Sequence, residues 1–178
     1  SGPSGSGKST ICKLLYRSLG TYSGNIEFNN TSECDYSLKA IRENILYVGQ
    51  NEKLFTGTIR ENIECFRPVA EETFKDVCKI CRLDSIVSGR PNRFNTVINA
   101  SLNNLSGGEK QRIILARALL KKAKIIILDE ALSEVNVTME KEILDDIFVY
   151  FKDCTLIYVT HKNVDDKFEH IIRLEASC

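Results

Sequence analysis

A glycine-rich loop at the start of the chain is the feature that most limits how the chain can fold. Residues 2–10 read Gly-Pro-Ser-Gly-Ser-Gly-Lys-Ser-Thr and match the pattern G-x-x-x-x-G-K-S/T. Glycines let such a loop curl until its backbone N–H groups surround phosphate oxygens. Lys8 would then place its charge at the β- and γ-phosphates, and the Ser9 hydroxyl is the expected Mg²⁺ ligand. The residues expected to surround the phosphates are Gly2, Ser4, Gly5, Ser6, Gly7, Lys8, Ser9 and Thr10.

The residues that follow the loop have the spacing of an amphipathic helix. Apolar side chains at 11, 14, 15 and 19 fall on one helical face, and Gly20 is the expected stop. A helix that begins at the loop directs its positive dipole end toward an anion. A Gly/Ser-rich N-terminus can also be a linker, but the Lys-Ser-Thr ending and this helix favour the phosphate loop. Because such a loop normally follows a buried strand and only Ser1 precedes it, we expect the first strands of the domain to be missing.

Composition and charge fit one globular domain and indicate no polyanionic partner. The chain has 178 residues, of which 43% are hydrophobic, enough for a substantial core. Its 24 basic and 24 acidic residues give a formal net charge of zero, so we expect no global attraction to nucleic acid or to an anionic membrane. No apolar run approaches the length of a membrane span.

The cysteines leave two interpretations open. Cys78 and Cys81 form a C-x-x-C motif, which is typical of zinc or redox chemistry. No second such motif and no nearby pair of histidines completes a zinc site. The motif also lies in a helical stretch where small apolar side chains pack well, so we favour reduced structural thiols.

The rest of the chain alternates short apolar runs with amphipathic helices. This alternation is typical of a parallel sheet with helices on its faces. The expected strands are 24–28, 45–48, 124–128, 155–159 and 170–174, and the expected helices are 37–44, 58–63, 71–81, 84–87, 138–151 and one that begins at Ser106. The helix-rich stretch 51–121 indicates a helical insertion in an α/β core.

Two acids, Asp129 and Glu130, end the strand expected at 124–128. The β-branched residues of this strand suit a central parallel position, and ligands of such sheets bind beyond the carboxyl ends of the strands. Beside a phosphate-binding loop, Asp129 is expected to hold Mg²⁺ and Glu130 to act as general base for the attacking water. The alternative is a strand that merely reaches solvent in an acidic turn.

A second pair of glycines lies in residues 105–112, which read Leu-Ser-Gly-Gly-Glu-Lys-Gln-Arg. Ser106 and Glu109 have the spacing of a capping box at a helix N-terminus. The two glycines between them leave that N-terminus bare, which suits close approach to phosphate. An ordinary capped helix would carry the same local pattern.

Five segments together resemble the nucleotide-binding domain of ABC ATPases, in the family's order and spacing. They are Gly2–Ser9 (Walker A), Gln50 after Tyr47-Val48-Gly49 (Q-loop), Leu105–Glu109 (LSGGQ signature), Ile125–Asp129 followed by Glu130 (Walker B and the catalytic acid) and His161 (switch histidine). The resemblance spans essentially the whole chain, 1–178. It implies an α/β P-loop NTPase core with a mainly parallel sheet flanked by helices, at 1–50 and 122–178, and an inserted helical subdomain at 51–121.

The resemblance also implies an activity and an arrangement of the site. The activity is Mg²⁺-dependent ATP hydrolysis by two such domains, arranged head to tail around two ATP molecules. Catalytic roles fall on Glu130, His161 and Gln50, and the Mg²⁺ ligands are Ser9, Gln50 and Asp129. ATP on one domain would be covered by the partner's signature, which comprises Ser106, Gly107, Gly108 and Glu109. The family's adenine-stacking aromatic residue lies upstream of Walker A, so we expect it outside this sequence.

Two segments depart from the family's pattern. The signature ends in Glu109 rather than Gln, a frequent variant. The D-loop, usually Ser-Ala-Leu-Asp, reads Ser133-Glu134-Val135-Asn136. Asn136 keeps the shape of the usual Asp but loses its charge, so communication between the two sites can differ.

The segment Phe55–Ile63 resembles exporter-type ABC transporters, whose fused membrane domains contact this surface. Thr96–Ala100 shares the resemblance, although the Glu usual near Ala100 is absent. These features imply substrate export, transmembrane domains as partners and a place on the cytoplasmic face of a cell membrane, with no nucleic acid bound.

Two other functions stay open as alternatives. One is a soluble ABC ATPase that acts on DNA or ribosomes. DNA-acting members carry a long coiled coil between Walker A and the signature, whereas the roughly one hundred residues here show no heptads. The other is a non-hydrolysing regulator, which the presence of Glu130, His161 and Gln50 disfavours.

Overall fold

The chain forms two compact units that interleave along the sequence. The structure is a computed structural model that describes residues 2–3, 5–99, 104–162 and 168–175. The first unit comprises Ser1–Gly49, Ala123–Glu130 and Thr155–Cys178, and the second comprises Gln50–Lys122 and Ala131–Cys154. The second unit thus takes in residues 131–154 beside the helical stretch, and the division expected at 50 and 122 stays a prediction. None of the helices in the described ranges is long and apolar enough to cross a membrane.

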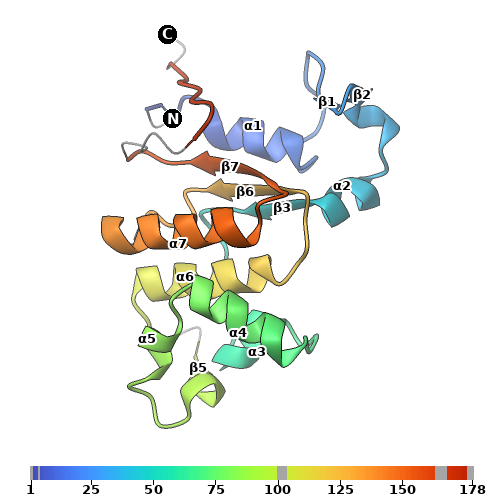
Figure 1. Ribbon diagram of the computed structural model, residues 1–178. Helices are drawn as coiled ribbons and strands as arrows, with labels where there is room; N and C mark the ends of the chain where they lie inside the picture. The colour runs from blue at the N-terminus through green and yellow to red at the C-terminus, as the bar shows by residue number, and fades with distance from the viewer. Residues whose placement is uncertain (1, 4, 100–103, 163–167, 176–178) are drawn as a thin grey trace. The chain divides into compact units, whose positions relative to one another are not determined.

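A parallel sheet organises the first unit (Figure 1). Its strands β3 (Ile45–Val48), β6 (Ile125–Asp129) and β7 (Thr155–Val159) lie in the order β3-β6-β7. All three run parallel, with Val48 opposite Leu128 and Asp129 opposite Val159. Consecutive residues of β6 are buried, as a central strand requires. The predicted central position of this strand is therefore confirmed.

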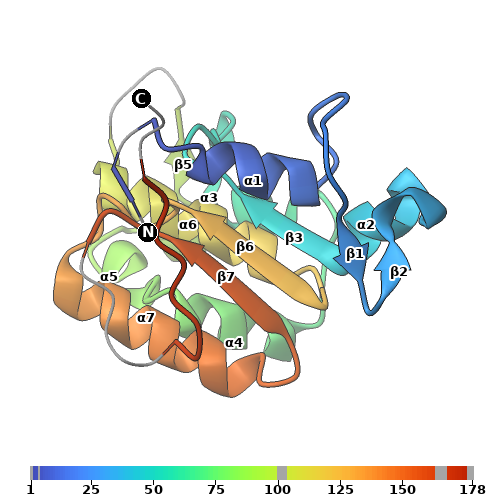
Figure 2. The ribbon, with the colours of Figure 1, turned by 90° about the horizontal axis from the view of Figure 1, so that it is seen from above.

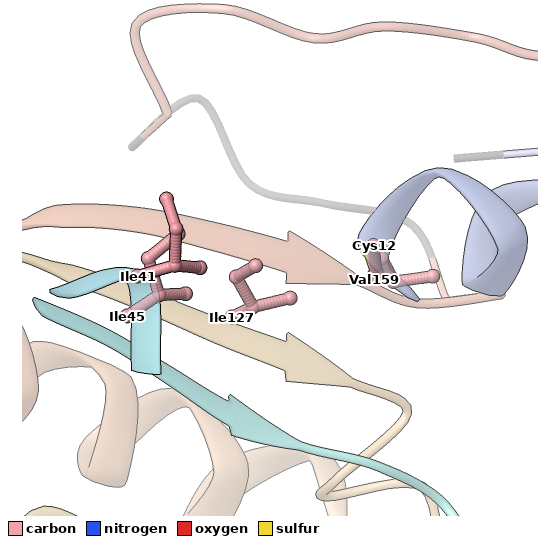
Figure 3. Close-up of a cluster of buried hydrophobic side chains, with 5 residues drawn as sticks. All are labelled: Cys12, Ile41, Ile45, Ile127 and Val159. Carbon is pink, nitrogen blue, oxygen red and sulfur yellow. The ribbon is translucent and has the colours of Figure 1, made fainter. Parts of the chain in front are cut away.

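Helix α1 (Lys8–Leu15) lies along one face of this sheet (Figure 2). A cluster of buried side chains holds the two together, and Figure 3 shows its members Cys12, Ile41, Ile45, Ile127 and Val159. Because residues two apart on a strand share a face, Asp129 points to the same side of β6 as Ile127. The packing of α1 therefore brings the phosphate loop to the carboxyl end of β6.

Shorter elements complete the first unit. Helix α2 (Leu38–Asn44) is capped by the Ser37 hydroxyl, which accepts a hydrogen bond of 3.1 Å from the Ala40 N–H. The strands β1 (Glu27–Phe28) and β2 (Thr31–Ser32) form an antiparallel hairpin that leads into the 3₁₀ turn η1 (Glu33–Asp35).

The second unit is mainly helical. Its elements are β4 (Gly57–Thr58), α3 (Ile59–Glu64), α4 (Glu71–Ile80), α5 (Asp84–Val87), η2 (Arg93–Asn95), β5 (Val97–Ile98), α6 (Gly107–Leu119) and α7 (Val137–Tyr150). Helix α6 packs against α3 and α4, α4 also packs against α7, and β4 pairs antiparallel with β5. Side-chain caps from Thr58, Ser106 and Asn136 start α3, α6 and α7. The predicted helix start at Ser106 is confirmed.

Three expected elements are shorter or absent. Helix α1 ends at Leu15 instead of reaching Gly20, because Arg17 takes a positive φ of 49° and its guanidinium bonds the Tyr36 carbonyl at 2.7 Å. The strand expected at 24–28 is limited to Glu27–Phe28. The segment 170–174 is not a strand, because strand propensity alone does not make a ladder.

Candidate active site

The phosphate loop is shaped by glycines and closed by its own lysine. Gly5 and Gly7 have φ values of 81° and 87°, which disfavour residues with a side chain. The buried Lys8 ammonium donates to the carbonyl oxygens of Gly2 at 2.8 Å and of Pro3 at 2.6 Å. The first turn of α1 has no side-chain cap, and such a bare helix N-terminus suits an anion.

Helix α1 and strand β6 meet at the Asp129 carboxylate. The Ser9 hydroxyl donates to Asp129 Oδ1 at 2.9 Å, and the Tyr47 hydroxyl donates to Oδ2 at 2.9 Å. Only 2% of the Asp129 surface is exposed. Hydroxyl and carboxylate oxygens are the donors that Mg²⁺ prefers, so Ser9 and Asp129 fit this ion. From the sequence, Tyr47 has no assigned role beyond its place in the strand expected at 45–48.

The acid after Asp129 is held in an unusual backbone conformation. Glu130 has a φ of 55°, and its N–H donates to the Val159 carbonyl at 3.1 Å. Its carboxylate Oε1 lies 2.5 Å from Nε2 of His161. A non-glycine residue in this region costs about 1–3 kcal/mol, and such residues cluster at functional sites. The structure thus brings together two side chains that the sequence singled out separately.

The second unit contains the predicted signature at the start of α6. The Ser106 hydroxyl accepts from the Glu109 N–H at 3.3 Å, and the Ser106 N–H donates to Glu109 Oε2 at 2.7 Å, so both halves of the capping box form. A Cβ atom at Gly107 would lie 1.6 Å from Oε2 of Glu134, and one at Gly108 would lie 2.8 Å from the Glu134 carbonyl oxygen. Glycine is therefore needed at position 108, where the backbone of Glu134 packs, whereas at position 107 an added Cβ would displace only the Glu134 side chain.

The side-chain amide of Gln111, on α6, makes two hydrogen bonds with the turn before α7. Gln111 Nε2 donates to the Ser133 hydroxyl at 2.9 Å, and Gln111 Oε1 accepts from the Glu134 N–H at 2.9 Å. Asn136 caps α7, since its Oδ1 accepts from the Met139 N–H at 2.9 Å. Asn and Asp are comparable caps, so Asn136 preserves the local structure that the usual Asp would give. Sequence analysis missed Gln111 and the contact of Glu134 with the signature.

The buried cysteines Cys12, Cys78 and Cys81 are free thiols, and the described residues contain no group of three or more His, Cys, Asp or Glu side chains that could hold a metal ion. Burial, and after it the charge of Asp129, raises the pKa of the Cys12 thiol to about 12. Burial likewise raises the pKa of Cys78 to about 12 and that of Cys81 well above its usual range. These thiols are protonated near neutral pH, which favours a packing role.

The two units carry different parts of the predicted site. Lys8, Ser9, Asp129, Glu130 and His161 all belong to the first unit. The second unit contains Gln50 and the signature residues Ser106, Gly107, Gly108 and Glu109. Ser4 and Ala100 lie outside the described residues. The roles assigned to all of them stay predictions.

Comparisons with known proteins agree on one family. The model of the family described as ABC transporter matches residues 1–133. The Lactococcin-G-processing and transport ATP-binding protein LagD of Lactococcus lactis subsp. lactis is 39% identical over 163 residues, 90% of this chain and 23% of that protein. The Microcin-J25 export ATP-binding/permease protein McjD of Escherichia coli is 39% identical over 163 residues, 90% of this chain and 28% of that protein. A bacterial Atm1-family ABC exporter with ATP bound has a similar structure, with a TM-score of 0.82 at 30% identity over 90% of this chain and 28% of its own.

Proposed function

This chain belongs to the ABC transporter family, and we propose that it binds ATP and hydrolyses it with Mg²⁺ as the nucleotide-binding domain of an exporter. It spans 23% to 28% of the length of the relatives compared above. The observation that carries the proposal is the 2.9 Å hydrogen bond from Ser9 to Asp129, which joins the phosphate loop to the acidic end of β6.

Each group of the first unit has a chemical task in this reaction. The loop N–H groups and Lys8 bind the β- and γ-phosphates, and in doing so Lys8 exchanges its two loop carbonyls for phosphate oxygens. Mg²⁺, when bound by Ser9 and Asp129, would neutralise charge on the phosphates. Glu130 accepts the proton of the attacking water as general base. His161, 2.5 Å from the Glu130 carboxylate, orients it.

The partners follow from the likeness to exporters. A second such domain would complete each site, with Ser106, Gly107 and Gly108 covering the partner's ATP and with Gln50 sensing Mg²⁺ and water. Membrane-spanning domains would contact the second unit near Phe55–Ile63, on the cytoplasmic side of the membrane. McjD is an export ATP-binding/permease protein and the structural relative is an exporter, which favours export over the soluble, DNA- or ribosome-acting alternative.

The test compares nucleotide binding and hydrolysis in the protein expressed from its complete reading frame. The wild type should hydrolyse ATP only with Mg²⁺ or a similar divalent ion. Lys8→Ala should lose nucleotide binding, whereas Lys13→Ala, which removes an exposed amine from the same helix, should not. ATP binding that survives Lys8→Ala unchanged, or hydrolysis without divalent ions, would contradict the proposal.

A further inference from the structure

We infer that Tyr47 is a positioning residue for the proposed Mg²⁺ site, because its hydroxyl fixes the orientation of the Asp129 carboxylate. This inference rests on the proposed function and adds to it a residue to which the five segments assign no role. Tyr47 lies on β3, a different strand from Asp129, and three positions before Gln50 in the chain.

Each oxygen of the Asp129 carboxylate accepts a hydroxyl from a different element. Ser9 on α1 donates to Oδ1 and Tyr47 on β3 donates to Oδ2, both at 2.9 Å. With 2% of its surface exposed, Asp129 has little access to bulk water that could replace either donor. A buried carboxylate left without a partner is costly, so the two hydroxyls together determine its rotamer.

Two neighbours restrict the position of the Tyr47 ring and therefore of its hydroxyl. The ring stacks on the Tyr16 ring, with centroids 5.5 Å apart and planes inclined by 22°. It also lies close to Gly49, where an added Cβ would be 3.0 Å from Tyr47 Cε1 and 3.1 Å from the hydroxyl oxygen. Gly49 therefore leaves the space that the ring occupies.

The register of the sheet explains why Tyr47 reaches Asp129. Tyr47 lies opposite Ile127, and Asp129 is two residues farther along on the same face of β6. The Ser9 hydroxyl would serve both as a metal ligand and as the donor to Oδ1, whereas the Tyr47 hydroxyl only orients the carboxylate. Tyr47 would continue to hold Oδ2 and so present Oδ1 in one orientation.

The experiment removes the Tyr47 hydroxyl and measures how ATP hydrolysis depends on the Mg²⁺ concentration. In Tyr47→Phe, the Mg²⁺ concentration that gives half-maximal ATP hydrolysis should rise by about tenfold. Loss of a hydrogen-bond partner of a metal ligand typically weakens metal binding by about 10- to 100-fold, and this value is the lower end of that range. The rate at saturating Mg²⁺ should change little. Mn²⁺ binding with a non-hydrolysable ATP analogue, followed by electron paramagnetic resonance, should weaken by a similar factor. Gly49→Ala, which pushes the ring away, should shift the metal dependence in the same direction.

A matched control separates positioning from a general structural role. Tyr36→Phe removes a hydroxyl in the same unit that donates to the Phe28 carbonyl at 3.2 Å, and it should leave the metal dependence unchanged. Unchanged metal dependence in Tyr47→Phe, or an equal shift in Tyr36→Phe, would overturn the inference and leave the proposed function standing. A wild type without Mg²⁺-dependent hydrolysis would overturn the proposed function, and this inference with it.

Discussion

Replacing Asn62 with alanine should destabilise the second unit strongly, because one buried amide joins three parts of it. The Asn62 side chain is 0% exposed. Its Oδ1 accepts from the Phe55 N–H and from the Arg117 guanidinium, both at 3.0 Å. Its Nδ2 donates to the carbonyl oxygens of Phe55 and Thr58, also at 3.0 Å. The turn before α3, helix α3 itself and helix α6 are thereby held together.

The structure sets the size of the effect. Four hydrogen bonds at about 1 kcal/mol net each give a loss of about 3–4 kcal/mol in the free energy of unfolding of Asn62→Ala. Alanine fills less space and offers no replacement donor or acceptor, so the Phe55 N–H and the carbonyl oxygens of Phe55 and Thr58 would each lose a side-chain hydrogen bond. The segment Phe55–Ile63, where membrane domains are proposed to contact the protein, would lose its anchor to α6.

Urea-induced unfolding, followed by circular dichroism, measures the change. Asn44→Ala is the matched control, since this exposed amide makes one bond, 3.0 Å long, to the Ala40 carbonyl within its own helix. The control should stay within about 0.5 kcal/mol of the wild type. A loss of less than about 1 kcal/mol in Asn62→Ala would refute the reasoning that the buried amide network holds this unit together.

Two further predictions concern the thiols and the signature glycines. Because burial raises the pKa of Cys12 and Cys78 to about 12, their neutral forms stabilise the fold, so the free energy of unfolding should fall as pH rises from about 8.5 toward 12. Alkylation followed by mass spectrometry should label both more slowly than exposed Cys34, and equal rates would contradict their burial. Gly108→Ala should cost about 1–3 kcal/mol by thermal unfolding, because a Cβ there meets a backbone carbonyl. Gly107→Ala should cost less, because it meets only the mobile end of a Glu side chain; the reverse order would contradict the contact geometry.

Local signals were sufficient for much of the fold. The apolar run at residues 45–48, the Ser106–Glu109 capping pair and the apolar run before Asp129 placed β3, α6 and β6 within a residue or two. These features are determined by neighbours in the sequence. The segment 170–174 has the same apolar character but is not a strand, since a strand also depends on a partner that local sequence does not specify.

The same distinction between local signals and long-range contacts holds for the residues of the site. Patterns in the sequence singled out Ser9, Asp129 and Glu130 because each stands at a defined place in a motif. The contacts of Tyr47 and Glu134 were not anticipated, because they join elements that are far apart in the chain. Spacing along the sequence cannot show which hydroxyl reaches a buried carboxylate.

Glu130→Gln tests the central claim most directly, namely that this site hydrolyses ATP with Glu130 as general base. Gln keeps the size and one hydrogen-bond acceptor but removes the basic oxygen that lies beside His161. Turnover of Mg-ATP should fall by about 10²–10⁴-fold, the usual contribution of general-base catalysis, while ATP binding survives. Measured on the protein from its complete reading frame, ATP should then accumulate in a closed dimer of the domain. Near-normal turnover in Glu130→Gln would contradict the account, because the base would then lie elsewhere.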